Sequence, residues 1–135
     1  MNNNINAIGG FPYVVAALSE TQFKASAGNQ TLLKYTPQSD ELVLVVVGLS
    51  TTPLIDGSQW IGIQAGWTDR SGNEWYGGNG ILLASIYGAY FTQTNAVVTE
   101  LQLEAGTEVD ITSNIAFGDA VDFTYLVNVA IVKIM

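Results

Sequence analysis

The most constraining feature of this sequence is an alternation of apolar and polar residues between positions 99 and 112. Leucines alternate with Glu and Gln before Ala105-Gly106-Thr107, and Val and Ile alternate with acidic residues after it. A period of two places successive side chains on opposite faces of a β-strand, whereas a helix needs a period of about 3.6. The pattern therefore predicts two strands joined as a hairpin at this turn, each with one face on a core.

A third strand is predicted after this hairpin, and its last part is apolar on both faces. Every second residue from Val121 to Ile131 is apolar, and the opposite face also becomes largely apolar from Leu126 onward. Such a strand belongs in the middle of a sandwich or under a partner subunit, and in a chain of 135 residues the partner subunit is the simpler explanation. The predicted subunit contacts are Leu126, Ala130, Val132 and Ile134.

The remainder of the chain shows more short segments with strand character, separated by turn residues. Strands are expected within residues 11–18, 22–25, 31–36, 42–49 and 81–91, with a hairpin at 60–76. The segment 42–49 is apolar on both faces and predicts a fully covered strand, and Gly72 suits the left-handed position of the hairpin turn. About eight to ten strands without an amphipathic helix predict an all-β fold, a single β-sandwich or jelly-roll domain spanning residues 11–135.

The first ten residues differ from the rest in composition. They are rich in Asn, contain few apolar side chains and end in Gly9-Gly10, so they cannot bury enough apolar surface to fold alone. We expect a flexible arm, free or docked on a partner. Its candidate docking residues are Asn2, Asn3, Asn4, Ile5 and Ile8.

Composition excludes several classes of function. The sequence has no Cys and no His, which removes disulfides, thiolate nucleophiles, zinc sites of the usual kind and histidine acid–base catalysis. A net charge of −8 repels phosphate backbones, so we expect no nucleic-acid binding. The sequence shows neither a signal-peptide pattern nor an apolar run of about 20 residues, so we expect a soluble chain made in the cytoplasm, with no membrane partner and no cofactor.

Two groups of polar residues are candidates for a catalytic or a metal site. The four carboxylates Glu100, Glu104, Glu108 and Asp110 alternate with core residues, which favours a solvated strand face over a glycosidase pair. Asp69, Asn73 and Glu74 offer oxygen ligands for Ca²⁺, but their spacing does not match an EF-hand and suits an ordinary turn. We therefore expect neither catalysis nor a metal ion.

Three aromatic residues are the stronger candidates for a binding site. Trp60, Trp75 and Tyr76 fall in the predicted hairpin, where an aromatic side chain on the outside of a strand can stack on a sugar or anchor a protein interface. A place in the core or in a subunit contact is the favoured interpretation, and a glycan site is the alternative.

Five segments, taken in order, resemble a known type of domain. They are residues 34–37 (Lys-Tyr-Thr-Pro), 42–51, 67–72 (Trp-Thr-Asp-Arg-Ser-Gly), 101–107 (Leu-Gln-Leu-Glu-Ala-Gly-Thr) and 123–134. Their order resembles the small jelly-roll domains of the C1q and tumour-necrosis-factor type found in bacteriophage virion proteins. The resemblance covers about residues 30–135 and implies a homotrimer with the final strand near the three-fold axis.

These observations predict a structural role and not an enzyme. The favoured function is a trimeric capsid decoration (cement) or head-fibre protein, located in the virion after assembly in the host cytoplasm and bound to the major capsid protein or another virion protein. The alternative is a receptor-binding tip domain of a tail fibre that recognises host surface glycans. A carbohydrate-active or metabolic enzyme is the third and weakest alternative, because no convergent polar cluster is evident.

Overall fold

The computed structural model describes residues 12–52, 55–75, 80–89, 93–116 and 122–135. The arm of residues 1–10, Tyr76 and Val121 lie outside the described residues. Nine strands and one short 3₁₀ turn, η1 (Ala25–Ala27), make up the described chain. The strands are β1 (Tyr13–Lys24), β2 (Thr31–Tyr35), β3 (Glu41–Thr52), β4 (Ile55–Thr68), β5 (Glu74–Trp75), β6 (Ile81–Ala89), β7 (Gln93–Leu103), β8 (Val109–Ala116) and β9 (Thr124–Lys133).

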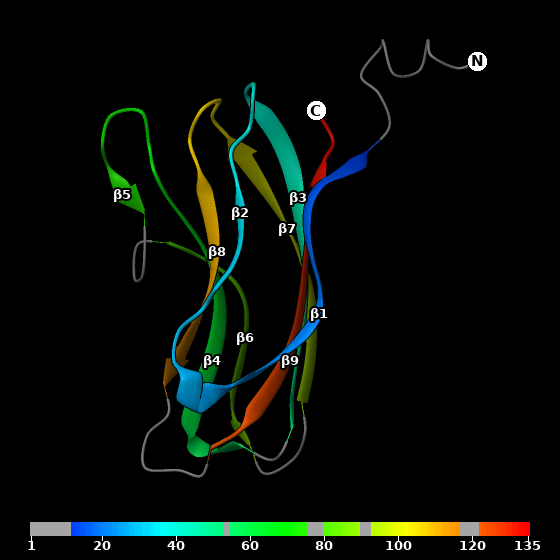
Figure 1. The fold of residues 1–135 in the computed structure, drawn as a ribbon, viewed down its shortest axis with the longest axis vertical. Helices are drawn as coiled ribbons and strands as arrows, with labels where there is room; N and C mark the ends of the chain where they lie inside the picture. Colours follow the sequence, from blue (N-terminus) through cyan, green and yellow to red (C-terminus); the bar gives the residue numbers. More distant parts are fainter. Residues whose placement is uncertain (1–11, 53–54, 76–79, 90–92, 117–121) are drawn as a thin grey trace, which may run out of the picture.

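The strands form two antiparallel sheets that pack face to face as a jelly-roll sandwich (Figure 1). Sheet 1 has the order β1-β9-β3-β7, and sheet 2 has the order β2-β8-β4-β5, with β6 also paired to β4. The chain passes repeatedly from one sheet to the other, so most neighbours in a sheet are distant in sequence, with β4 and its partners β5 and β6 as the exception. The prediction of an all-β jelly-roll sandwich is confirmed.

The core lies between the two sheets and follows from the alternation of each strand. On β9, the inward residues Tyr125, Val127, Val129 and Ile131 are each at most 1% exposed. The inward side chains of β3, β4 and β8 meet them, and most are β-branched. Because such side chains pack well on a pleated surface, they both favour the strands and fill the space between the sheets.

The predicted hairpin at residues 99–112 is wrong. The two strands exist with the predicted inward residues, but β7 pairs with β3 in sheet 1 and β8 pairs with β2 and β4 in sheet 2. The turn at Ala105-Gly106-Thr107 therefore passes between the sheets, and the amide of Gly106 donates a hydrogen bond of 2.9 Å to the Pro37 carbonyl. An alternating pattern shows which face of a strand is buried and does not show which strand lies beside it.

The second predicted hairpin is confirmed, although its return strand is short. Trp67 pairs with Trp75 and Thr68 with Glu74, and Gly72 adopts a φ of +86° in the turn between them. Residues 11–18 and 22–25 were expected to hold one or two strands. From residue 13 to residue 24 they form one strand, β1, with two register shifts.

The prediction that residues 42–49 are covered on both faces is wrong within the single chain. Val43, Val45, Val47 and Leu49 are at most 1% exposed because they face sheet 2. The alternate residues of β3 face outward from sheet 1 and are only half-buried. One face of β3 thus remains open to a partner.

Polar contacts also cross the space between the sheets. The buried Tyr125 hydroxyl on β9 lies 3.0 Å from the hydroxyl of Ser113 on β8. At one end of the sandwich, the carboxylate of Glu41 is 3% exposed, accepts a 2.7 Å hydrogen bond from the Tyr35 hydroxyl and lies 3.6 Å from Lys133 Nζ. Burial and this carboxylate raise the pKa of the Tyr35 hydroxyl well above its usual range.

Candidate functional site

The predicted subunit contacts lie on the outer face of sheet 1. Leu126, Ala130 and Val132 alternate with the core residues of β9 and are half-buried, and Ile134 follows just beyond the end of the strand. The register of the sheet places apolar neighbours on both sides of Ala130 and Val132, whereas Leu126 lies between Gln22 of β1 and Ser50 of β3. Val132 lies between Leu44 of β3 and Val14 of β1.

The next row across the sheet continues the same surface. Ala130 lies between Val46 of β3 and Ala17 of β1, and Val46 is also paired with Val98 of β7. Val98 is 60% exposed in the single chain. We call this surface the apolar face of sheet 1; it consists of Val14, Ala17, Leu44, Val46, Val98, Leu126, Ala130 and Val132.

The sequence revealed only part of this surface. The members on β9 were identified from the two-sided apolar pattern, whereas Val14, Ala17 and Val98 lie in edge strands whose neighbours only the sheet order shows. The signal for Leu44 and Val46 was present in the apolar run of residues 42–49, but it was interpreted as burial within the domain.

A polar position interrupts the apolar face next to its second row. Asn128 of β9 is exposed and is paired with Gly48 of β3. The Asn128 side-chain amide lies directly over Gly48, in the space that a Cβ would occupy there. A hollow of about 160 Å³ adjoins this pair and is lined by Glu20, Gly48, Leu49, Ser50, Leu126 and Asn128.

The three aromatic candidates do not form one site. Trp60 lies on the outer face of sheet 2, where its ring covers Gly62 and its centroid is 6.1 Å from that of Tyr87. Trp75 is paired with Trp67, and Trp67 is seven residues from Trp60 on β4. This separation corresponds to about 23 Å along the strand. Tyr76 lies outside the described residues, and Tyr87 was missed by the sequence analysis.

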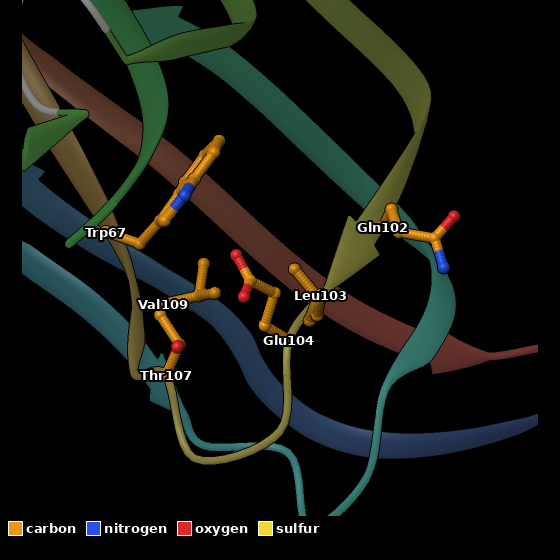
Figure 2. Close-up of a pocket in the computed structure, with 6 residues that line it drawn as sticks. All are labelled: Trp67, Gln102, Leu103, Glu104, Thr107 and Val109. Atoms are coloured by element: carbon orange, nitrogen blue, oxygen red, sulfur yellow. The ribbon is translucent and has the colours of Figure 1, made fainter. Parts of the chain in front are cut away.

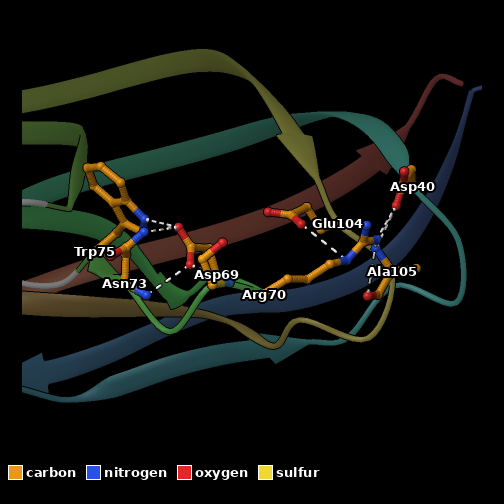
Figure 3. A network of polar contacts seen from close by, with 8 residues as sticks. Asp40, Asp69, Arg70, Asn73, Trp75, Glu104 and Ala105 are labelled. Carbon is orange, nitrogen blue, oxygen red and sulfur yellow. Dashed lines mark hydrogen bonds and ion pairs between the residues drawn. The ribbon is translucent and has the colours of Figure 1, made fainter.

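Trp75 is held in place by the turn that precedes it. The Asp69 carboxylate accepts hydrogen bonds from the amides of Ser71 and Asn73, from the Asn73 side chain and from Trp75 Nε1, at 2.9–3.1 Å (Figure 3). These donors lower the pKa of Asp69, with the Trp75 bond contributing most. Asp69, one of the residues considered as Ca²⁺ ligands, thus orders the backbone of its own turn and holds Trp75. The ring of Trp75 stacks on that of Trp67, with the ring centroids 6.3 Å apart.

A single arginine connects the same turn to the opposite sheet. Arg70 lies 2.6 Å from the carboxylate of Asp40 and 3.1 Å from that of Glu104 (Figure 3). Asp40 also accepts a bond from the Ala105 amide, and this bond, followed by Arg70, lowers the pKa of Asp40. The pairs are exposed, so each stabilises the fold only weakly, but together they align three turns at one end of the sandwich.

The four carboxylates proposed as a catalytic alternative are divided between the sheets. Glu100 and Glu104 belong to or follow β7, whereas Glu108 and Asp110 precede or lie within β8. Lys34 lies 3.6 Å from Glu108, and Asp110 is paired with Lys34 in the ladder. Burial, followed by the neighbouring Glu108, raises the pKa of Asp110.

The pocket beside Trp67 is too small for a substrate (Figure 2). Its volume of about 20 Å³ can hold one water molecule. The lining residues are Trp67, Gln102, Leu103, Glu104, Thr107 and Val109. Within the described ranges, no group of three or more acidic, His or Cys side chains could hold a metal ion, and no described helix is long and apolar enough to cross a membrane.

Comparison with known proteins adds information on the fold. No family model matches the sequence, and no curated protein matches it significantly. Among solved structures, a chain in the structure of infectious bursal disease virus strain Gx aligns with 92% of this chain at a TM-score of 0.57 and 13% identity. The VP2 subviral particle of the same virus aligns with 90% of it at 0.56 and 13% identity.

The chain spans only about a third of the length of these viral chains, 32% in both cases. Eiger TNF from S. frugiperda aligns over 94% of its own length and 93% of this chain at 13% identity, but its TM-score of 0.49 is too low to support an argument. The likeness to the viral proteins thus shows a shared jelly-roll fold, and the function has to be argued from the surfaces of this chain.

Proposed function

We propose that this chain is a non-enzymatic structural protein of a bacteriophage virion and that it works as a homotrimer. The observation that carries the proposal is the apolar face of sheet 1, where Val14 and Val98 are 56% and 60% exposed in the single chain. Each square ångström of apolar surface removed from water stabilises an assembly by about 25 cal/mol, so an exposed apolar face of this kind favours association. The likeness to a virus particle protein supports a place in a particle.

The position of Asn128 supports a closed assembly with a defined register. A polar side chain at the border of an apolar seam restricts the number and alignment of chains, because its amide must find a partner when the seam becomes dry. In a trimer with β9 near the three-fold axis, the three copies of Asn128 come together and satisfy one another.

The mass of the purified protein tests this assembly. Three chains of 14.4 kDa each give 43.2 kDa. Light scattering at micromolar concentration should yield this mass, and a mass of one chain would refute the trimer.

The proposed role in the virion is capsid decoration or a head fibre, with the arm docked on the major capsid protein or another virion protein. Deleting residues 1–10 should leave the melting transition unchanged and weaken co-sedimentation with purified capsids, if these residues contribute to the partner contact and not to the isolated core. A large loss of thermal stability on deletion would show instead that residues 1–10 belong to the folded domain.

The second candidate is a receptor-binding tip, favoured by the aromatic side chains on the surface. Trp75 is 40% exposed, and Trp60 adjoins the exposed Tyr87. Saturable binding of the wild-type protein to host cells, lost in Trp75→Ala at constant mass, would favour the tip. Binding to capsids without binding to cells supports decoration.

A further inference from the structure

We propose that the outer face of sheet 2 carries a binding site for a neutral saccharide, built on Trp60 and Tyr87. The site is separate from the apolar face of sheet 1, since the two surfaces lie on opposite sides of the sandwich. It therefore does not depend on the trimer, and it would point away from a trimer assembled through sheet 1.

The aromatic part of the site consists of two rings and one aliphatic side chain. Trp60 and Tyr87 are directly paired between β4 and β6, with ring centroids 6.1 Å apart and planes inclined by 47°. Tyr87 is 67% exposed and Leu82, on the same strand, is 47% exposed. Large apolar side chains that are exposed next to one another are typical of a recognition surface.

Gly62 holds the indole ring of Trp60 down on the sheet. A Cβ at residue 62 would overlap this ring and would also contact Leu82 at 3.1 Å. The indole Nε1 is buried and has no hydrogen-bond partner among the described residues. A ligand therefore meets mainly the hydrocarbon part of the ring, which suits the C–H face of a sugar.

A chain of side-chain amides lies beside the rings. In the ladder, Gly62 is paired with Asn114 of β8, so the Asn114 amide lies one strand away from the position that the indole covers. Asn114 Nδ2 donates to Gln64 Oε1 at 2.9 Å, and Asn29 Nδ2 donates to Asn114 Oδ1 at 3.2 Å. Asn29 Oδ1 in turn accepts from the Ile115 amide at 3.0 Å, which anchors the chain to the backbone.

This chain of amides is held in place and still has capacity to bind a ligand. Each amide group has two donor hydrogens and two acceptor lone pairs, and the bonds described use only part of them. The hydroxyl groups at the rim of a sugar ring bind both hydrogen-bond donors and acceptors, which side-chain amides supply together. The C–H face of the sugar ring packs on an aromatic surface. The combination favours a saccharide over a purely apolar partner.

The charges favour a neutral saccharide. Trp60, Tyr87, Gln64 and Asn114 are uncharged, and Asp110, the acidic residue of β8, is four positions from Asn114, or about 13 Å along the strand. The whole chain has a net charge of −8, so a sialylated or uronic-acid probe would be repelled on approach.

The test is a titration of the full chain with neutral oligosaccharides. The probes are the hexaoses of glucose, mannose and N-acetylglucosamine, with trigalacturonate as the anionic probe, followed by calorimetry and by tryptophan fluorescence in a Trp67→Phe, Trp75→Phe background. At least one neutral hexaose should bind with a dissociation constant below about 10 mM and shift the emission of Trp60, and trigalacturonate should not bind.

Variants assign the binding to these residues. Tyr87→Ala, at an exposed position, should weaken binding about tenfold at unchanged melting temperature, and Asn114→Ala should weaken it several-fold. The matched control is Tyr13→Ala, which removes an exposed tyrosine ring on β1 of sheet 1 and should leave binding unchanged. Trp60→Ala removes a half-buried ring, so Tyr87→Ala decides the case if the Trp60 variant fails to fold.

Three results would overturn the site: no neutral hexaose bound by the wild type at about 10 mM, equal binding by Tyr87→Ala, or equal loss in Tyr13→Ala. Capsid retention that Tyr87→Ala abolishes, without saccharide binding, would identify the face as a protein contact. The mass measured in the same samples reports on the trimer, so the two proposals fail independently.

Discussion

Replacing Val132 by Asp should dissociate the proposed trimer into folded single chains. Val132 lies between Leu44 and Val14 at the centre of an apolar row and is half-buried in the single chain. In the single chain the new carboxylate reaches water, because the side chain points away from the core. In the trimer it would be enclosed by apolar side chains of a partner without a cation to pair with.

The expected effect is large because the substitution is repeated in every subunit. An unpaired charge in a dry interface costs about 3 kcal/mol or more, so three copies cost about 9 kcal/mol. Since each 1.4 kcal/mol is about a factor of ten, the association constant should fall by about six orders of magnitude. Light scattering should then show 14.4 kDa in place of 43.2 kDa at micromolar concentration.

Two control variants separate charge from shape and from position. Val132→Thr keeps the branched shape without a charge and should remain a trimer at somewhat lower stability. Thr31→Asp introduces the same charge at an exposed position of sheet 2 and should leave the mass unchanged. A Val132→Asp protein with the wild-type mass and melting temperature would refute the reasoning, since it would show that this end of β9 is exposed in the assembly.

Three further predictions concern the single domain. Gly62→Ala should cost about 1–3 kcal/mol of stability and change the emission of Trp60, because the indole ring must move. Gly48→Ala should cost less than about 1 kcal/mol, because only the flexible amide side chain of Asn128 has to rotate away. Equal losses of stability in chemical denaturation would contradict this difference. Asp110→Asn should raise the melting temperature at pH 7 and have no effect at about pH 3. In the wild type the pKa of Asp110 is raised by folding, so the folded chain retains this proton more strongly than the unfolded chain. The wild type therefore loses stability as the pH rises above the unfolded pKa of about 3.9. A variant that is stabilised equally at both pH values would refute this sign. Tyr125→Phe should cost about 1 kcal/mol in urea unfolding, because it removes the buried hydroxyl contact between the sheets, and an unchanged midpoint would show that this contact contributes nothing.

The strands could be predicted from the sequence because alternation is a local property. Leu101, Leu103, Val109 and Ile111 were expected on the core side, and all four are at most 6% exposed. The hairpin joining them could not be decided in the same way. A turn such as Ala105-Gly106-Thr107 reverses the chain whether the next strand joins the same sheet or crosses to the other one, and the partner is chosen by packing over the whole domain.

The candidate surfaces could likewise be predicted from the sequence only in part. The sequence by itself determined the all-β class, the inward face of each strand and the apolar second face of β9, because these depend on residues two positions apart. Only the tertiary structure decided that Val14 and Val98 extend that face, that Trp60 and Trp75 lie far apart, and that Tyr87 and Asn114 flank Trp60. A surface is made by neighbouring strands, and in this fold most neighbouring strands come from distant parts of the chain.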